Sequence, residues 1–433
     1  MESHKKYELT PAQLALAKSR KEKKERLAAE ALAKLHSTEL LSRPWLGLPV
    51  ENPKIRNHRA KVFTWNLLAQ CLIRRELFPT SDCLKAGQRE SLIHEEICRQ
   101  NADILCLQEV DRLEKLLPML EKAGYSPHYA SGRGKLHGCL IAFKNDLYSM
   151  IAEKVIFYDD LSVDIPKSTR FASSFKTRNI GYMIALRSKV DETEGAVVAT
   201  THLFWHPRYT YERIRQAGML LREVTAFRRD LSVDRWPCII AGDFNFSPID
   251  PAYSLITGDS LLPSQEDTIS PSLVVHASLD PTVMENAPTP PAAEDESEDD
   301  PDRVITNARP ATIDDGLLTI PELVDWFSKL PTPRSAYNDG LHEARKHDNN
   351  LPTYGTRVAL TPGRRGSDEP EYTSYTHFWQ SVLDYIFFLD SAERPISVVG
   401  LLTPLKSPDL APGLPQKRVS GSDHTCLVAE LTW

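Results

Sequence analysis

The chain has 433 residues, of which 41% are hydrophobic, enough to bury a large core. Its formal net charge of −7 matches the seven acidic side chains between residues 294 and 302. The rest of the chain is therefore close to neutral, which does not exclude a nucleic-acid ligand.

The cysteines and the hydropathy pattern indicate the cellular compartment of the protein. Seven cysteines, an odd number with no Cys-x-x-Cys spacing, indicate a reducing compartment rather than a disulfide scaffold. No run of about 18 apolar residues occurs, and no apolar signal core stands at the N-terminus. We therefore expect a soluble intracellular protein, cytoplasmic or nuclear, with no membrane partner.

Residues 10–35 are predicted to form one helix, because a Thr-Pro start is followed by alanines and leucines. Residues 18–26 are basic with interleaved glutamates, which is typical of a solvated helix, or of a nuclear-targeting or RNA-contacting arm. Two prolines and a glycine between 44 and 49 indicate a linker. We therefore expect residues 1–50 to precede a folded body at 51–433.

The first two predicted strands each end in a polar side chain. Residues 61–66 form an apolar strand that ends at Asn66, and a helix of roughly 15 residues follows it. Residues 104–109 form a second buried strand, and Glu109 stands where this strand leaves the core. A single glutamate in such a place is usually a surface or capping residue.

Further strands and helices follow in the middle of the chain. We expect a helix at 113–122, strands around 138–144, 150–158, 180–187 and 196–203, and a long helix at about 208–231. The strand at 196–203 delivers His202 near its end, although a single histidine there is more often a hydrogen-bonded core residue.

The segment from Cys238 to Pro248 is the most informative stretch of the sequence. Four small or apolar residues make a buried strand, and Asp243 and Asn245 follow it two positions apart. Side chains two apart on an extended chain point to the same side, so the amide can orient a carboxylate that polarises water or binds a metal. The same pattern also ends many strands as an ordinary Asx turn.

Past Pro251 the chain becomes polar and aperiodic, and predicted helices and strands return only further along the sequence. Residues 259–312 are rich in proline, serine and acid without periodicity, so we expect a disordered insertion and no second core. Beyond it we expect a helix at 321–330, a strand at 383–388 that carries Asp384, and a last strand entered through Asp423 and His424.

These strand ends together define a candidate site. If the strands pack as a sandwich, three or four carboxylates, two histidines and two amides can converge on one pocket. Several carboxylates in a small space need a cation, and oxygen ligands favour Mg²⁺ or Mn²⁺. Such a site is suited to phosphoryl hydrolysis.

Seven motifs carry a resemblance to the endonuclease/exonuclease/phosphatase superfamily: Trp65-Asn66-Leu67-Leu68, Leu107-Gln108-Glu109-Val110, Asn179-Ile180-Gly181, Thr201-His202-Leu203, Gly242-Asp243-Phe244-Asn245, Leu383-Asp384-Tyr385 and Ser422-Asp423-His424. The resemblance covers about residues 62–433, apart from the insertion. It implies an α/β fold, a four-layer sandwich of two packed mixed β-sheets with outer helices, like that of pancreatic deoxyribonuclease.

Two further segments narrow the resemblance within the superfamily. His202 to Pro207 and the Tyr-Thr-x-Phe run before Asp384 resemble the carbon-catabolite-repressor deadenylases, nocturnin and angel. The basic N-terminal helix and the lack of leucine-rich repeats make the fungal Ngl-type RNA exonucleases the most similar. The resemblance implies a Mg²⁺-dependent 3′–5′ exoribonuclease that acts on single-stranded RNA 3′ ends, in rRNA maturation or poly(A) removal.

The resemblance also implies roles for individual residues. The metal ligands would be Glu109, Asn66 and Asp423. The catalytic group, in which Asn245 orients Asp243 to activate water and Asp384 holds His424 near the phosphate, would be Asp243, Asn245, His424, Asp384 and His202. The substrate-binding residues would be Asn179, Trp205, Pro207 and His377. His377 stands where the deadenylases carry a phenylalanine that stacks on adenine, so strict adenine preference is not implied.

Three alternatives stay open at this point. A nucleotide or inositol phosphatase would use the same site on a monoester, and an abasic-site DNA endonuclease would use it on a duplex. A catalytically silent scaffold would only bind RNA. The Trp-His-Pro stretch favours an RNA end over inositol, and the complete set of acids and histidines argues against the silent scaffold.

Overall fold

The computed structural model describes residues 40–49, 58–163, 171–286, 305, 307–391 and 395–433. The predicted basic helix at 10–35 and the acidic run at 294–302 lie outside these residues. Within the described ranges, no helix combines the length and the apolar character that a membrane crossing requires.

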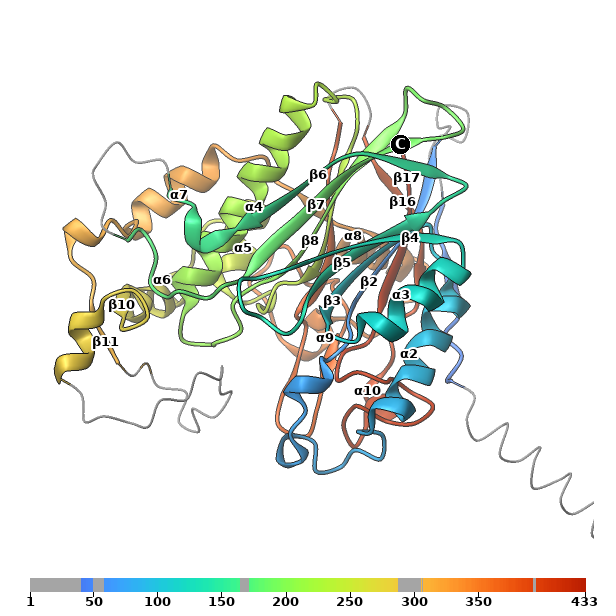
Figure 1. Ribbon diagram of the computed structural model, residues 1–433, viewed down its shortest axis with the longest axis horizontal. Helices are drawn as coiled ribbons and strands as arrows, with labels where there is room; N and C mark the ends of the chain where they lie inside the picture. The colour runs from blue at the N-terminus through green and yellow to red at the C-terminus, as the bar shows by residue number, and fades with distance from the viewer. Residues whose placement is uncertain (1–39, 50–57, 164–170, 287–304, 306, 392–394) are drawn as a thin grey trace, which may run out of the picture.

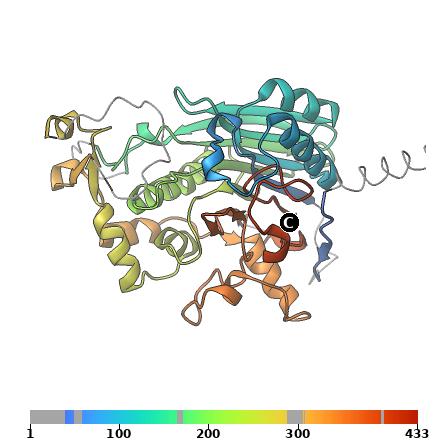
Figure 2. The ribbon, with the colours of Figure 1, turned by 90° about the horizontal axis from the view of Figure 1, so that it is seen from below.

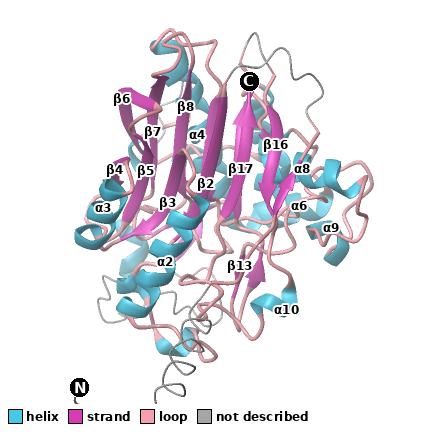
Figure 3. Ribbon diagram, turned by 90° about the vertical axis from the view of Figure 1, so that its right-hand side faces the viewer, coloured by secondary structure: helices cyan, strands magenta, loops and turns pink. Residues whose placement is uncertain are grey.

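Two β-sheets pack face to face (Figures 1 and 3). The larger sheet contains, among the described residues, β1 (Trp45–Gly47), β16 (Ser397–Leu402), β17 (Leu427–Thr432), β2 (Arg59–Asn66), β3 (Ile104–Val110), β5 (Gly138–Lys144) and β4 (Tyr125–Ser131), in this spatial order. The smaller sheet contains β12 (Arg334–Ser335), β15 (Asp384–Leu389), β9 (Cys238–Asp243), β8 (Gly195–His202), β7 (Ile180–Ser188) and β6 (Tyr148–Phe157). Two short pairs stand apart: β10 (Val274–His276) with β11 (Ala308–Pro310), and β13 (Ser374–Tyr375) with β14 (Gln380–Ser381).

Helices cover both outer faces of the paired sheets (Figure 2). The larger sheet is covered by α2 (Ala86–Gln100) and α3 (Leu113–Lys122). The smaller sheet is covered by α4 (Thr210–Asp230), α5 (Pro251–Thr257) and α7 (Ile320–Ser328). The remaining described α-helices are α6 (Pro263–Ile269), α8 (Ala336–Arg345), α9 (Tyr354–Arg357) and α10 (Ser407–Leu410). The predicted four-layer α/β sandwich is confirmed.

Side-chain alternation along the central strands builds the layers. On β2, Val62 packs between the sheets, and Phe63 packs under α2 and α3. On β9, Ile239 packs between the sheets, and Ile240 packs toward α4. Because both faces of each sheet are covered, these strands read in the sequence as continuous apolar runs.

Strand direction brings the polar strand ends to one edge. β2 and β3 run parallel, so Asn66 and Gln108 lie opposite each other near the ends of their strands. β8 and β9 also run parallel, which places His202 opposite Asp243. β15 runs antiparallel to β9 and places Asp384 opposite Asp243. The convergence expected from the sequence is therefore a consequence of the sheet topology.

The predicted linker around residues 44–49 is wrong, so the folded body begins before residue 51. β1 pairs with β16 at the sheet edge. The buried guanidinium of Arg43 donates to the backbone oxygens of Thr403 (3.0 Å) and Cys426 (3.0 Å). Prolines are tolerated beside an edge strand, so the same residues that suggested a linker flank a short strand.

The prediction that residues 259–312 are disordered is also wrong for residues 259–286, which carry α6 and β10. β11, near the end of the segment, pairs with β10. Arg309 links the two ends of the segment, because its guanidinium contacts Asp280 at 2.8 Å and Asp315, just past the segment, at 2.7 Å. Charged pairs and short strands hold this segment, which composition alone does not reveal.

Glu369 gives a testable prediction about stability. Its side chain is fully buried, and the hydroxyl of Tyr253 donates to its Oε1 at 2.9 Å. Burial raises the pKa of Glu369 from 4.5 to about 8. The folded state then holds this proton more tightly than the unfolded state, so the contribution to stability is complete below pH 4.5 and is lost as the pH rises through about 8.

Glu369→Gln cannot ionise, so its melting temperature should rise relative to wild type between pH 5 and pH 9, as followed by circular dichroism. Glu114→Gln, on the exposed face of α3, is the control. A difference between Glu369→Gln and wild type that stays constant with pH would contradict the buried, protonated carboxyl.

Candidate active site at the strand ends

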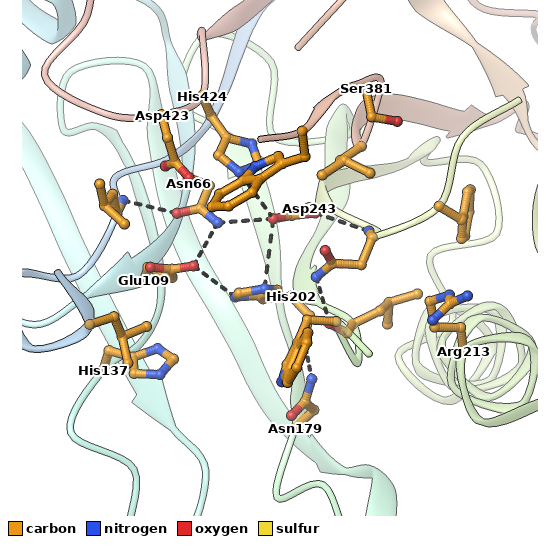
Figure 4. Close-up of a pocket in the computed structure, with 18 of the residues that line it drawn as sticks. Asn66, Glu109, His137, Asn179, His202, Arg213, Asp243, Ser381, Asp423 and His424 are labelled. Atoms are coloured by element: carbon orange, nitrogen blue, oxygen red, sulfur yellow. Dashed lines mark hydrogen bonds and ion pairs between the residues drawn. The ribbon is translucent and has the colours of Figure 1, made fainter. Parts of the chain in front are cut away.

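A cavity of about 880 Å³ opens at the edge where the polar strand ends converge (Figure 4). This volume lies near the upper end for pockets that hold small organic ligands. Ten of the twelve residues proposed from the sequence line the cavity: Asn66, Glu109, Asn179, His202, Trp205, Pro207, Asp243, Asn245, Asp423 and His424. Asp384 and His377 are not among the described residues that line it.

Asn66 holds the two carboxylates of the centre at fixed positions. Its Nδ2 donates to Glu109 Oε1 and to Asp243 Oδ2, each at 2.9 Å. Its Oδ1 accepts from the backbone N–H of Leu68 at 2.9 Å, which fixes the amide orientation. Glu109 also accepts from the N–H of Ala69 at 2.8 Å, and its backbone has a φ of +53°, rare for a residue with a side chain.

Asp243 is oriented by a backbone group. Its Oδ1 accepts from the backbone N–H of Asn245 at 3.0 Å. The Asn245 amide instead donates to the carbonyl of Leu203 at 2.9 Å, because the left-handed backbone of Asn245 (φ +52°) turns the chain at this point. The prediction that the Asn245 side chain orients Asp243 is therefore wrong, although Asn245 does position it.

Two histidines flank Asp243. His202 lies with Nε2 3.7 Å from Asp243 Oδ2 and with Nδ1 3.8 Å from Glu109 Oε1. His424 lies on the other side, with Nε2 3.8 Å from Asp243 Oδ2 (Figure 4). Asp384 Oδ2 lies 2.7 Å from His424 Nδ1, so Asp384 holds the ring from outside the cavity.

The charge state of the two histidines differs. Burial would lower the pKa of His424, but the charges of Asp384 and Asp423 outweigh burial and raise this pKa well above its usual value. Burial lowers the pKa of His202 to about 4, and Glu109 only partly opposes this shift. At neutral pH the structure therefore favours a protonated His424 and a neutral His202.

The acidic residues fit a hard divalent cation. Burial raises the pKa of Asp243 to about 7, with the charge of Asp384 adding to the effect, and burial also raises the pKa of Asp423. Asp384 Oδ1 is buried without a hydrogen-bond partner among the described residues. The carboxylates of Glu109, Asp243 and Asp423 line this cavity, and oxygen donors are the ligands that Mg²⁺ and Mn²⁺ prefer.

Two groups of donors could hold such a cation. Ligand atoms of Asp243, Asp384 and His424 lie within 4.8 Å of one another. Since Asp384 and His424 already bond to each other, we favour the carboxylates of Glu109 and Asp423 with the Oδ1 of Asn66, which retains a second lone pair.

Asn179 lines the cavity, but both polar atoms of its side chain bond to the protein. Its Nδ2 donates to the carbonyl of His202 at 2.8 Å. Its Oδ1 accepts from Lys135 Nζ at 2.8 Å. A direct contact between Asn179 and a phosphate or ribose therefore stays a prediction.

The placement of His377 in the base pocket is wrong for this structure. Thr376 Oγ1 accepts from the backbone N–H groups of Phe378 (3.2 Å) and Trp379 (3.0 Å), which makes a tight turn. The turn leaves His377 exposed and places Phe378 and Trp379 on the cavity wall. The aromatic residues that line the cavity therefore follow His377 by one and two positions in the sequence.

Arg89 supports the site from behind and was not found from the sequence. Its buried guanidinium donates to the carbonyls of Leu67 and Leu68, to that of Gly421 at 2.6 Å, and to Gln70 Oε1 at 2.9 Å. These bonds join the loop after Asn66 to the loop that leads to Asp423. Arg89 stands in the first turn of α2, where the helix dipole disfavours a cation, and this is the signal that sequence inspection could have used.

Further cavity-lining residues were also missed from the sequence. They are Lys135, His137, Arg178 and Arg213. Each comes from a loop or helix whose position depends on the packing of distant segments, so local sequence patterns do not indicate them.

Arg89→Met should destabilise the protein, because it leaves at least three buried carbonyl oxygens without a donor. We expect the free energy of unfolding in urea to fall by about 3 kcal/mol. Arg229→Met, at an exposed position, should have no comparable effect. Equal stability of the Arg89 variant and wild type would show that these bonds do not hold the two loops together.

Known proteins are similar to this chain in sequence. A profile of the Endonuclease/Exonuclease/phosphatase family matches residues 63–424. The chain is 29% identical to a probable RNA exonuclease of Schizosaccharomyces pombe, over 96% of this chain and 87% of that protein. It is 32% identical to the RNA exonuclease NGL2 of Saccharomyces cerevisiae, over 58% of this chain but only 53% of that protein.

Solved structures share the fold. A 2′,3′-cyclic phosphatase, ANGEL2, in complex with adenosine-2′,3′-vanadate matches with a TM-score of 0.58 and 21% identity, over 91% of this chain and 99% of that one. The human nocturnin catalytic domain with bound sulfate matches with a TM-score of 0.51 and 20% identity, over 90% of this chain and 97% of that one. At these identities the likeness concerns the fold alone.

Proposed function

The chain belongs to the endonuclease/exonuclease/phosphatase family, and we propose that it is a divalent-metal-dependent exoribonuclease that shortens single-stranded RNA from the 3′ end. The observation that carries the proposal is the convergence of Glu109, Asp243 and His424 on one open cavity. The relatives named RNA exonucleases in two yeasts support RNA as the substrate class. The role of such trimming, in rRNA maturation or poly(A) removal, is part of the proposal.

The reaction is the hydrolysis of a phosphodiester bond. A water oxygen attacks phosphorus, the P–O3′ bond breaks, and the leaving 3′-oxygen takes a proton from solvent. Asp243 accepts the proton of the attacking water. Its carboxylate is fixed for this role, since Asn66 donates to one oxygen and the backbone of Asn245 donates to the other.

The charge that develops on the phosphate needs stabilisation. His424, protonated and held by Asp384, donates a hydrogen bond to a non-bridging oxygen, and His202 donates a second from the other side. Glu109, Asn66 and Asp423 would hold a Mg²⁺ or Mn²⁺ ion, which neutralises phosphate charge when bound.

Apolar residues on the cavity wall support a nucleotide substrate. Trp205, Pro207, Phe378 and Trp379 line the cavity, and Phe378 is 58% exposed. Stacking of a base on an aromatic side chain is worth about 1–3 kcal/mol in single-strand binding. An inositol ring offers no aromatic face, so this wall supports an RNA end over an inositol phosphate.

The proposal is tested with 5′-labelled RNA and purified protein in Mg²⁺. We expect a ladder of products that shorten from a free 3′ end, and no products from RNA whose 3′ end is blocked. Matched DNA, inositol phosphates and RNA with a 2′,3′-cyclic phosphate are the controls. Internal cleavage of the blocked RNA, or faster release of phosphate from a monoester, would contradict the exonuclease assignment.

Glu109→Gln should lower kcat by at least about 10³-fold, because it removes the charge of a metal ligand while keeping the side-chain size. Chelation with EDTA should abolish wild-type activity, and added Mg²⁺ or Mn²⁺ should restore it. Glu114→Gln, on an exposed glutamate, is the matched control and should keep full activity. Turnover by the Glu109 variant near the wild-type rate would refute its role as a metal ligand.

A further inference from the structure

Two chain segments on the cavity wall are held by one buried side chain that does not itself line the cavity. The segments are residues 177–179 and residues 203–207, which contribute Asn179 and Trp205 to the wall. Gln216, in the second turn of α4, is fully buried and is not among the described residues that line the cavity. Its hydrogen bonds reach both segments.

The amide of Gln216 bonds once to each segment. Its Oε1 accepts from the backbone N–H of Phe204 at 3.0 Å, and its Nε2 donates to Thr177 Oγ1 at 3.0 Å. Thr177 Oγ1 also accepts from the backbone N–H of Asn179 at 3.1 Å. These contacts need one acceptor and one donor on the same side chain, which an amide provides. Gln216 therefore links the two segments to α4 and to each other.

Glu212 fixes the orientation of the Gln216 amide. Glu212 Oε1 accepts from Gln216 Nε2 at 3.2 Å, and a carboxylate oxygen only accepts, so the nitrogen end of the amide faces Glu212. Glu212 and Arg215 are both fully buried, with 3.0 Å between Arg215 Nη2 and Glu212 Oε1. Breaking this pair would leave an unpaired charge in the core. The support behind the two segments is therefore rigid.

The catalytic centre is held by other contacts. The pairing of β8 with β9 places His202 opposite Asp243. Phe204 and the residues after it lie beyond the end of β8. Side chains of α4 hold them there, since Arg213 also donates to the carbonyl of Pro207 at 3.1 Å. The wall is thus fixed by α4, whereas the groups that act on the phosphate are fixed by the sheets.

We propose that Gln216 is a positioning residue that sets how tightly the cavity wall holds a base of the substrate. The proposal rests on the proposed function, in which Trp205 and Pro207 belong to a wall that supports a base. Without Gln216, the backbone at Phe204 loses its hydrogen bond next to Trp205, and the wall is free to move away from the base. Loss of Gln216 therefore weakens recognition of the base and leaves the hydrolysis of the phosphodiester bond intact.

RNAs that differ by one base test this role. A 5′-labelled RNA that ends in two adenosines is compared with two matched RNAs that carry an abasic ribose at the last or at the penultimate position. Wild type should cleave the intact RNA with a kcat/KM at least about tenfold above that of one of the abasic RNAs, which is the effect of a single stacked base. The abasic RNA that loses more shows which base the wall holds.

The variants are compared by the ratio of kcat/KM on the intact RNA to kcat/KM on that abasic RNA, which does not depend on the amount of folded enzyme. Gln216→Met keeps the length of the side chain and removes both polar groups, so its ratio should fall toward one while its kcat/KM on the abasic RNA stays near the wild-type value. Gln216→Asn keeps the amide but is one carbon too short to reach both segments, so its ratio should also fall. The second variant decides the question if the first does not fold.

Gln100→Met is the matched control. Gln100 is also a buried glutamine, donates to Glu96 Oε1 at 3.0 Å on α2, and is not among the described residues that line the cavity. Its ratio should stay at the wild-type value. A general loss of packing would lower the rates on intact and abasic RNA together and leave the ratio unchanged.

Two failures can be told apart. If wild type shortens RNA but shows no preference for the intact RNA, or if the preference survives in the Gln216 variants, the positioning role is refuted and the proposed function stands. If wild type shortens no RNA, the proposed function fails. Calorimetric dissociation constants for AMP and for ribose 5-phosphate then decide the role of Gln216, which is refuted when the variants bind AMP as tightly as wild type does.

Discussion

The side chain of Asn66 is the physical link on which the site depends. Its amide donates to Glu109 of the larger sheet and to Asp243 of the smaller sheet, so one group joins the two halves of the sandwich. Two carboxylates held this close repel each other, and they are stable there only with donors and a cation between them. The orientation of Asn66, fixed by the N–H of Leu68, therefore sets the geometry of the whole centre.

The sequence predicted the fold and most of the site because the signal was local. Apolar runs that end in Asn66, Glu109, His202 and Asp243 are strand ends in any parallel arrangement, and their residue types already indicate oxygen chemistry. Short segments were harder to predict from the sequence. The edge strand β1 lies between prolines, and its existence depends on β16, more than 300 residues away. Local patterns carry no information about such a partner.

The errors at the cavity wall have the same origin. The turn around Thr376 decides whether His377 or its aromatic neighbours face the ligand, and that turn depends on hydrogen bonds that spacing does not reveal. The inserted segment is another example. The ring of His276, in this segment, packs on Phe175 with 4.3 Å between the ring centroids. Phe175 in turn packs on Phe204 with 4.8 Å between the centroids, and Phe204 precedes Trp205 in the sequence. A segment expected to be disordered thus supports the substrate-facing wall.

The most direct test of this account is the binding of Mn²⁺, followed by electron paramagnetic resonance in wild type and in Glu109→Gln. We propose that Asn66 gathers carboxylates around a divalent cation. Wild type should therefore bind Mn²⁺, and the variant should bind it at least about tenfold more weakly, with an unchanged fold by circular dichroism. Equal Mn²⁺ affinity in the two proteins, or no Mn²⁺ binding by wild type, would contradict the metal centre and the mechanism built on it.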